Sequence, residues 1–114
     1  MEKIKKFKLI LERHLGETTI YELDADLKKE KFIEILGKKI KEEEKDLESV
    51  DFLEKIYEIE KNASKLENEY INNNNIDGVE IKIYITYMNN KIKNIICKNK
   101  IPNEVEKILD VINI

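Results

Sequence analysis

Several residue types that usually carry chemistry are almost absent from this chain of 114 residues. It has one cysteine, one histidine, one arginine and one proline, and it has no tryptophan. The single cysteine, Cys97, excludes an internal disulfide and a zinc site built from several cysteines. Because Cys97 follows two isoleucines, we expect it to be a small buried hydrophobic residue.

Sites for phosphate, metal ions and cofactors are also missing. The three glycines stand far apart, at Gly16, Gly37 and Gly78, so the chain has no glycine-rich phosphate-binding loop. Asp24 and Asp26 lack the glycine and glutamate that a calcium-binding loop requires, and we interpret them as residues that begin a helix. With one histidine and one cysteine, the sequence predicts no metal site and no cofactor.

Long apolar segments are absent as well. No run of 18 apolar residues occurs, so no membrane-spanning helix is predicted. The N-terminal residues 1–15 are basic at their start, but they contain neither an uninterrupted apolar stretch nor a small-residue cleavage site. We therefore expect a cytoplasmic protein.

The residues that are abundant point to one acidic domain from an AT-rich genome. The chain contains 20 isoleucines, 20 lysines and 12 asparagines, whose codons are rich in A and T, which indicates a low-GC bacterium or its phage. Its length fits one domain, so residues 1–114 are expected to form a single α+β domain. The net charge of −3 arises in residues 17–70, which carry 17 acidic and 10 basic side chains.

Alternating apolar residues predict two β-hairpins. In residues 3–15 one face carries the apolar set, and residues 18–23 alternate as the return strand. Residues 79–87 alternate most regularly, and two asparagines suited to a tight turn lead into residues 91–97. The residues that we expect to face the core are Phe7, Leu9, Leu11, Leu15, Thr19, Tyr21, Leu23, Val79, Ile81, Ile83, Ile85 and Tyr87.

Helical spacing is predicted for the remaining segments. Residues 24–46 carry an apolar stripe that contains Phe32, Leu36 and Ile40, and residues 52–70 carry a heptad-like seam from Phe52 to Tyr70. A break near residues 45–50 separates the two, and residues 103–114 form a third helix after Pro102. The predicted order is β-β-α-α-β-β-α, a mainly antiparallel four-stranded sheet with three helices on one face.

The only candidate for acid–base catalysis is His14. In a strand His14 and Glu12 point to the same face, and a carboxylate can orient an imidazole. No nucleophile or metal motif accompanies them, so we interpret both as surface residues and predict that the protein is not an enzyme.

Two predicted surfaces are candidates for binding a protein. The outer face of the sheet exposes aromatic and flexible apolar residues, which are common at the centre of interfaces: Ile10, His14, Ile20, Tyr84 and Met88. The second surface is an acidic stretch that fits a basic groove meant for nucleic acid: Glu42, Glu43, Glu44, Asp46, Glu48 and Asp51.

A small acidic α+β protein without catalytic residues is similar to bacterial immunity proteins and to phage-encoded inhibitors such as anti-CRISPR proteins. This resemblance implies stoichiometric inhibition of a basic nuclease or a ribonucleoprotein effector. A first alternative is a structural or adaptor subunit, a homodimer that pairs edge strands or the seam at 52–70. A second is a nucleic-acid binder that uses lysine-rich hairpins, which the acidic net charge disfavours.

Overall fold

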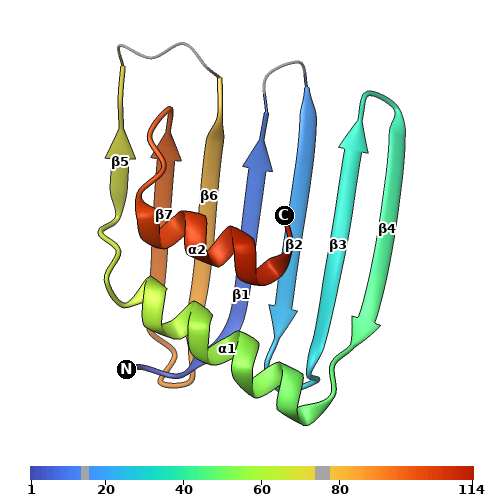
Figure 1. Cartoon of the computed structure of the whole chain (residues 1–114), viewed down its shortest axis with the longest axis vertical. Coiled ribbons are helices and arrows are strands. Elements are labelled where there is room, and N and C mark those ends of the chain that lie inside the picture. The colour runs from blue at the N-terminus through green and yellow to red at the C-terminus, as the bar shows by residue number, and fades with distance from the viewer. Residues whose placement is uncertain (14–15, 74–77) are drawn as a thin grey trace.

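A computed structural model of the chain shows two helices on one face of a seven-stranded sheet (Figure 1). The structure describes residues 1–13, 16–73 and 78–114. The strands in this part of the chain are β1 (Ile4–Glu12), β2 (Glu17–Asp24), β3 (Lys29–Leu36), β4 (Lys39–Asp46), β5 (Glu69–Ile71), β6 (Glu80–Tyr87) and β7 (Ile92–Lys98). The helices are α1 (Ser49–Ala63) and α2 (Asn103–Ile112).

The strands lie in the order β4-β3-β2-β1-β6-β7-β5. The first four strands form an antiparallel meander, and β1 at its inner edge also pairs with β6. The short strand β5 pairs with β7 in the parallel direction, which makes the sheet mixed. The N-terminal strand is therefore central, whereas the β3–β4 hairpin extends the sheet on one side (Figure 1).

Alternation along β1, β2, β6 and β7 places the core between the sheet and the helices. Leu9 on β1, Tyr21 on β2 and Ile83 on β6 have no exposed surface, whereas their sequence neighbours face the other side of the sheet. The predicted inward residues of the two hairpins that the structure describes are buried, with Val79 partly so, and Leu15 lies outside the described residues. The helices contribute the other half of the core through Phe52, Ile56, Ile59, Ala63, Val105, Ile108 and Ile112.

A bulge near the start of β1 brings both Ile4 and Phe7 into the core. The register with β6 shifts between Ile4 and Lys6. Beyond the shift, the odd-numbered residues of β1 face the core, whereas at its start the even-numbered Ile4 does. The buried carboxylate of Glu60 on α1 accepts a hydrogen bond of 2.7 Å from the backbone N–H of Ile4. This bond satisfies a donor at the bulge and ties α1 to the first strand.

The prediction of a helix over residues 24–46 is wrong, because this segment forms the β3–β4 hairpin. Phe32 pairs with Tyr21 of β2, and Ile33 pairs with Ile20, so tertiary pairing with β2 overrides the helical preference of the lysines and glutamates. Gly37 has a φ of +59° in the two-residue loop between β3 and β4, a conformation that favours glycine.

The predicted four-stranded sheet with three helices is therefore wrong, although the α+β class is correct. The seam at 52–70 was predicted as one helix, but α1 ends at Ala63 and Tyr70 lies in β5. Pro102 precedes α2 without a side-chain cap, and Asn113, with a φ of 62°, ends it in the left-handed conformation.

A buried polar network joins β2, β3 and α1. Glu30, which is 3% exposed, accepts hydrogen bonds of 2.8 Å from the hydroxyl of Tyr21 and from Nζ of Lys55. Burial, followed by the adjacent Glu30 carboxylate, raises the pKa of Tyr21, so the hydroxyl remains a donor. Because each partner comes from a different element, the network fixes how α1 lies against the β2–β3 pair.

Cys97 is buried, as predicted, and faces the core from β7. Burial raises the pKa of its thiol from 9.0 to about 11, so the thiol is neutral near pH 7. In the described residues no helix has the length and the apolar composition needed to cross a membrane.

Candidate interaction surface

The face of the sheet opposite the helices, which we call the open face, has no second layer in the described part of the chain (Figure 1). Open-face residues alternate with core residues along each strand, so their positions follow from the register. Ile10 of β1 pairs with Ile20 of β2, and Ile20 pairs in turn with Ile33 of β3. The chemistry of this face can therefore be described row by row across the strands.

Two neighbouring rows on the open face alternate in charge from strand to strand. We call them the charged rows. The first row runs from β4 to β1 through Glu44, Lys31, Glu22 and Lys8. The second row runs in the same direction through Asp46, Lys29, Asp24 and Lys6. Acidic residues of β2 and β4 thus flank the lysines of β3, an arrangement that stabilises cross-strand pairs.

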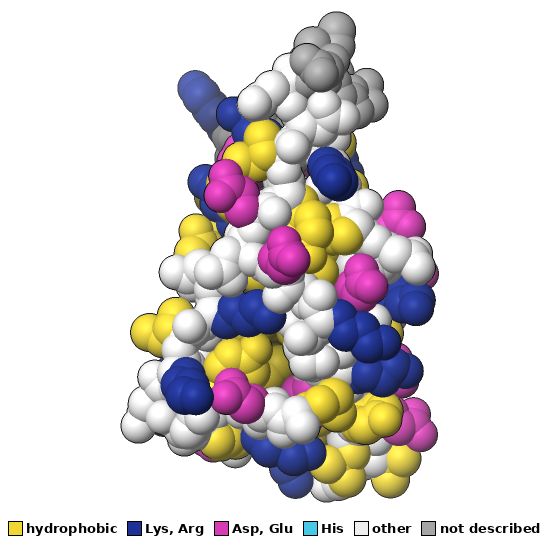
Figure 2. All heavy atoms as spheres, turned by 90° about the vertical axis from the view of Figure 1, so that its left-hand side faces the viewer, with side chains coloured by type: hydrophobic (Ala, Val, Ile, Leu, Met, Phe, Trp, Pro, Cys, Tyr) yellow, Lys and Arg dark blue, Asp and Glu magenta, His cyan; other side chains and the backbone are white. Residues whose placement is uncertain are grey.

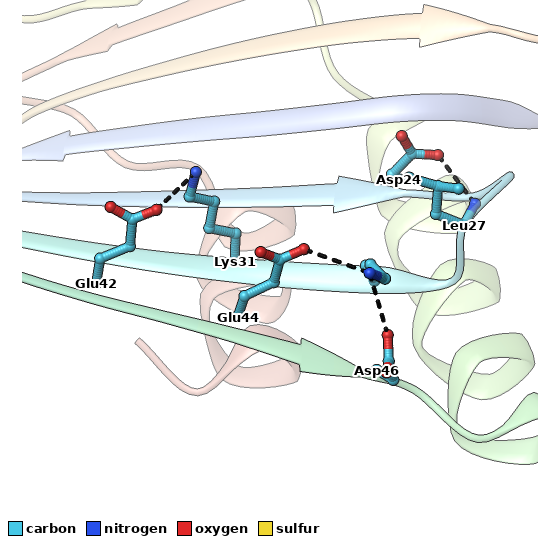
Figure 3. Close-up of polar contacts among 7 residues, drawn as sticks. Asp24, Leu27, Lys31, Glu42, Glu44 and Asp46 are labelled. Atoms are coloured by element: carbon cyan, nitrogen blue, oxygen red, sulfur yellow. Dashed lines mark hydrogen bonds and ion pairs between the residues drawn. The ribbon is translucent and has the colours of Figure 1, made fainter.

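Ion pairs formed by the lysines of β3 in the charged rows connect β3 to β4, as Figure 3 shows. Nζ of Lys31 lies 2.7 Å from a carboxylate oxygen of Glu42, and the bond to this carboxylate raises the pKa of Lys31. Nζ of Lys29 lies 3.8 Å from Glu44 and 3.8 Å from Asp46. Each of the three acidic side chains of β4 on the open face therefore contacts a lysine of β3.

Beside the charged rows lies a group of isoleucines, which we call the isoleucine patch. It spans four strands and consists of Ile10, Ile20, Ile33, Ile35 and Ile40. Ile40 is 68% exposed, and the other four are partly exposed. Covering such a surface releases about 25 cal/mol for each Å² of apolar area that leaves water. An apolar group beside charged residues on a sheet face is typical of a protein-binding surface.

A shallow depression of about 440 Å³ lies over the charged rows. Lysines and carboxylates line it together, and Tyr84, 40% exposed, stands at the β6 side next to Lys8. The lining provides hydrogen-bond donors and acceptors of both signs, but it contains no cysteine, histidine or serine that could act as a nucleophile or base. The arrangement is suited to polar contacts.

The acidic stretch that the sequence predicted as one surface is divided among three places. Glu42, Glu44 and Asp46 lie on the open face of β4, whereas Glu43 pairs with Phe32 and faces the helix side. The remaining two are exposed residues at the start of α1, where Glu48 is the N-cap and Asp51 lies in the first turn. A continuous acidic helix surface is therefore not formed.

The other predicted contact residues are placed as follows. Tyr84 lies on the open face together with Ile10 and Ile20, while Met88 is exposed just beyond the end of β6. His14 lies outside the described residues. Arg13, directly after the end of β1, is partly exposed, and its guanidinium contacts the Thr19 hydroxyl at 3.2 Å and the Glu17 carboxylate at 3.6 Å.

Sequence reasoning missed the part of the open face that β3 and β4 form. Lys29, Lys31, Ile33 and Ile35 were assigned to a helix, so neither the charged rows nor the full isoleucine patch could be assembled. The signal that was available is the central Gly37, which separates two segments of equal length, β3 and β4.

Other parts of the surface offer weaker candidates. On the side of the molecule near β5, hydrophobic, basic and acidic side chains are intermingled (Figure 2). The outer side of α1 exposes Val50, Leu53 and Tyr57, a short apolar stripe on a single helix. Among the described residues no group of three or more histidine, cysteine, aspartate or glutamate side chains could hold a metal ion.

No protein-family model matches this chain, and no curated protein or solved structure is significantly similar to it.

Proposed function

We propose that this chain is a non-catalytic protein-binding module that holds its partner through the open face of the sheet. The observation that carries the proposal is the isoleucine patch, which spans four strands and lies beside alternating charges. Apolar residues at the centre of such a surface supply affinity when they are covered, and the surrounding charges fix the orientation of the partner.

The target class that we propose is an enzyme that handles nucleic acid, such as a basic nuclease or a ribonucleoprotein effector, which the chain would inhibit by occupying its binding surface. The net charge of −3 supports this choice, because an acidic protein associates faster with a basic partner. Direct binding of nucleic acid is disfavoured because Lys8 lies 3.5 Å from Glu22 and both charged rows contain as many acidic as basic residues.

Capture of the partner by tagged protein tests this proposal, with one lysine substitution on each side of the molecule. Ile20→Lys places a charge in the centre of the isoleucine patch, whereas Leu53→Lys makes the same kind of change on the outer side of α1, where Leu53 is 62% exposed. We expect wild type and Leu53→Lys to retain one stoichiometric partner from a lysate of the native host, and Ile20→Lys to lose at least about 90% of it.

Circular dichroism and thermal unfolding provide the control, because both variants must remain folded for the comparison. If Ile20→Lys retained the partner while Leu53→Lys lost it, the outer side of α1 would be the interface. Equal retention by all three proteins would also reject the open face.

A further inference from the structure

We infer that in the absence of another partner the open face is covered by a second copy of this chain, in a two-fold symmetric dimer with the two sheets face to face. The inference rests on the proposed use of the open face as an interface. It is argued from the arrangement of charge on four neighbouring strands, which is complementary to itself.

The charges form columns of one sign along each strand. In the charged rows, β1 contributes Lys6 and Lys8, and β3 contributes Lys29 and Lys31. The columns between and beside them are acidic, with Glu22 and Asp24 on β2, and Glu44 and Asp46 on β4. Across the four strands from β4 to β1 the signs are therefore negative, positive, negative and positive.

A two-fold axis parallel to the strands, passing between β2 and β3, makes every one of these columns face a column of the opposite sign. The rotation does not change the position of a residue along the strand direction. It places β2 of the second copy opposite β3 of the first, and β1 of the second copy opposite β4 of the first. Glu22 then faces Lys31 of the second copy, and Lys8 faces its Glu44. An isologous contact of this kind repeats each pair twice.

The same axis places apolar residues at the centre of the contact. The row next to the charged rows contains Glu42, Ile33, Ile20 and Ile10 from β4 to β1. Under the rotation Ile20 faces Ile33 of the second copy. Two packed sheets cross at about 30° because of their twist, so pairs close to the axis remain in contact while outer pairs diverge. The pairs Glu22–Lys31 and Ile20–Ile33 are next to the axis.

The size of the contact makes the dimer weak and reversible. Four strands about 4.8 Å apart and about eight residues long cover roughly 500 Å² on each copy. Stable complexes bury about 800 Å² on each partner, so we expect a dissociation constant of the dimer in the micromolar range or higher. A dimer of this strength leaves the open face available to a tighter partner.

Complementary charge reversal tests the geometry. Glu22→Lys alone makes two lysines face each other at both symmetric positions, and Lys31→Glu alone makes two glutamates do so. Mixed in equal amounts, the two variants form a heterodimer in which the lysine introduced at position 22 faces the glutamate introduced at position 31, and the native Lys31 and Glu22 of the two copies face each other. Sedimentation equilibrium at low salt is the measurement.

The expected result has three parts. The wild-type mass rises with concentration from 13.6 kDa toward twice that value. Each single variant dissociates at least about tenfold more readily, and the equimolar mixture returns to within about threefold of the wild type. The matched control, Glu43→Lys, changes charge on the helix side of β4 and dimerises as the wild type does.

Should Glu22→Lys or Lys31→Glu fail to fold, the outer pair Lys8→Glu and Glu44→Lys provides a test of the same kind, with a smaller expected effect because these residues lie farther from the axis. A wild type that stays monomeric at about 1 mM overturns the inference, as does a mixture that shows no recovery. Neither outcome affects the proposed function. That proposal is tested by whether the Ile20→Lys variant still captures a partner that is a different protein. Conversely, partner capture that ignores Ile20→Lys rejects the proposed function whatever the mass of the protein in solution.

Discussion

Replacing Glu30 by alanine is expected to lower the free energy of unfolding by about 3–5 kcal/mol, the effect of removing one partner from a buried ion pair. Nζ of Lys55 and the hydroxyl of Tyr21 both lose the carboxylate that they contact at 2.8 Å. The Lys55 side chain is 15% exposed, so its charge would be left largely buried without a counterion. Such a loss is a large share of the roughly 5–15 kcal/mol that stabilises a domain.

Urea unfolding of Glu30→Ala and of Glu34→Ala measures this effect. Glu34 lies four residues further along β3, on the same face but exposed, so its replacement is expected to cost about 0.5 kcal/mol or less. The double variant Glu30→Leu with Lys55→Met removes both charges and is expected to be more stable than Glu30→Ala. Equal stability of Glu30→Ala and Glu34→Ala would show that the buried network contributes little.

Leu9→Ala is expected to cost about 2–5 kcal/mol of stability, whereas Ile10→Ala at the next position costs about 1 kcal/mol or less. The two side chains have the same number of carbon atoms and adjacent places on β1, but Leu9 is completely buried beneath the helices and Ile10 belongs to the isoleucine patch. Their difference in stability therefore reports which face of the sheet carries the core.

Partner binding is expected to distinguish Leu9→Ala and Ile10→Ala in the opposite direction from stability. Ile10→Ala is expected to weaken retention of the partner although the protein remains fully folded, because it removes apolar area from the open face. Unfolding midpoints and partner capture are measured on both variants. A larger loss of stability for Ile10→Ala than for Leu9→Ala would contradict this account, because it would show that the core lies on the face of the sheet that carries Ile10.

The β1–β2 and β6–β7 hairpins could be predicted because their alternation separates residues that face the core from residues that face solvent. Residues 79–87 place an apolar side chain at every second position, and Ile81, Ile83, Ile85 and Tyr87 are buried in β6. The asparagines at the turn gave a second signal, and Asn90 indeed has a φ of 67°. Here local pattern, turn chemistry and burial agree.

The β3–β4 hairpin could not be predicted from periodicity because β4 has none. All eight of its residues are exposed, so no apolar residue marks the buried side. The lysines and glutamates of this segment favour a helix, and Phe32, Leu36 and Ile40 happen to fit helical spacing. Folding the segment about Gly37 pairs opposite charges at four of its eight positions, which is a signal for a hairpin.

The candidate interface was only partly foreseen for the same reason. Ile10, Ile20 and Tyr84 were placed on the outer face of the sheet because their strands were assigned correctly. The lysines of β3, which form ion pairs with acidic residues of β4 on the open face, were placed on a helix. The acidic surface was therefore overestimated, and the alternation of charge across the strands could appear only in the folded structure.

Lysine cross-linking of the chain to its captured partner tests the central claim most directly. Lys8 and Lys31 lie on the open face, whereas the exposed Lys107 lies on α2 on the opposite side of the sheet. If the open face is the interface, mass spectrometry will find cross-links to the partner from Lys8 and Lys31, and Lys107 will form few or none. Cross-links concentrated at Lys107, with Lys8 and Lys31 unlinked, would contradict the account.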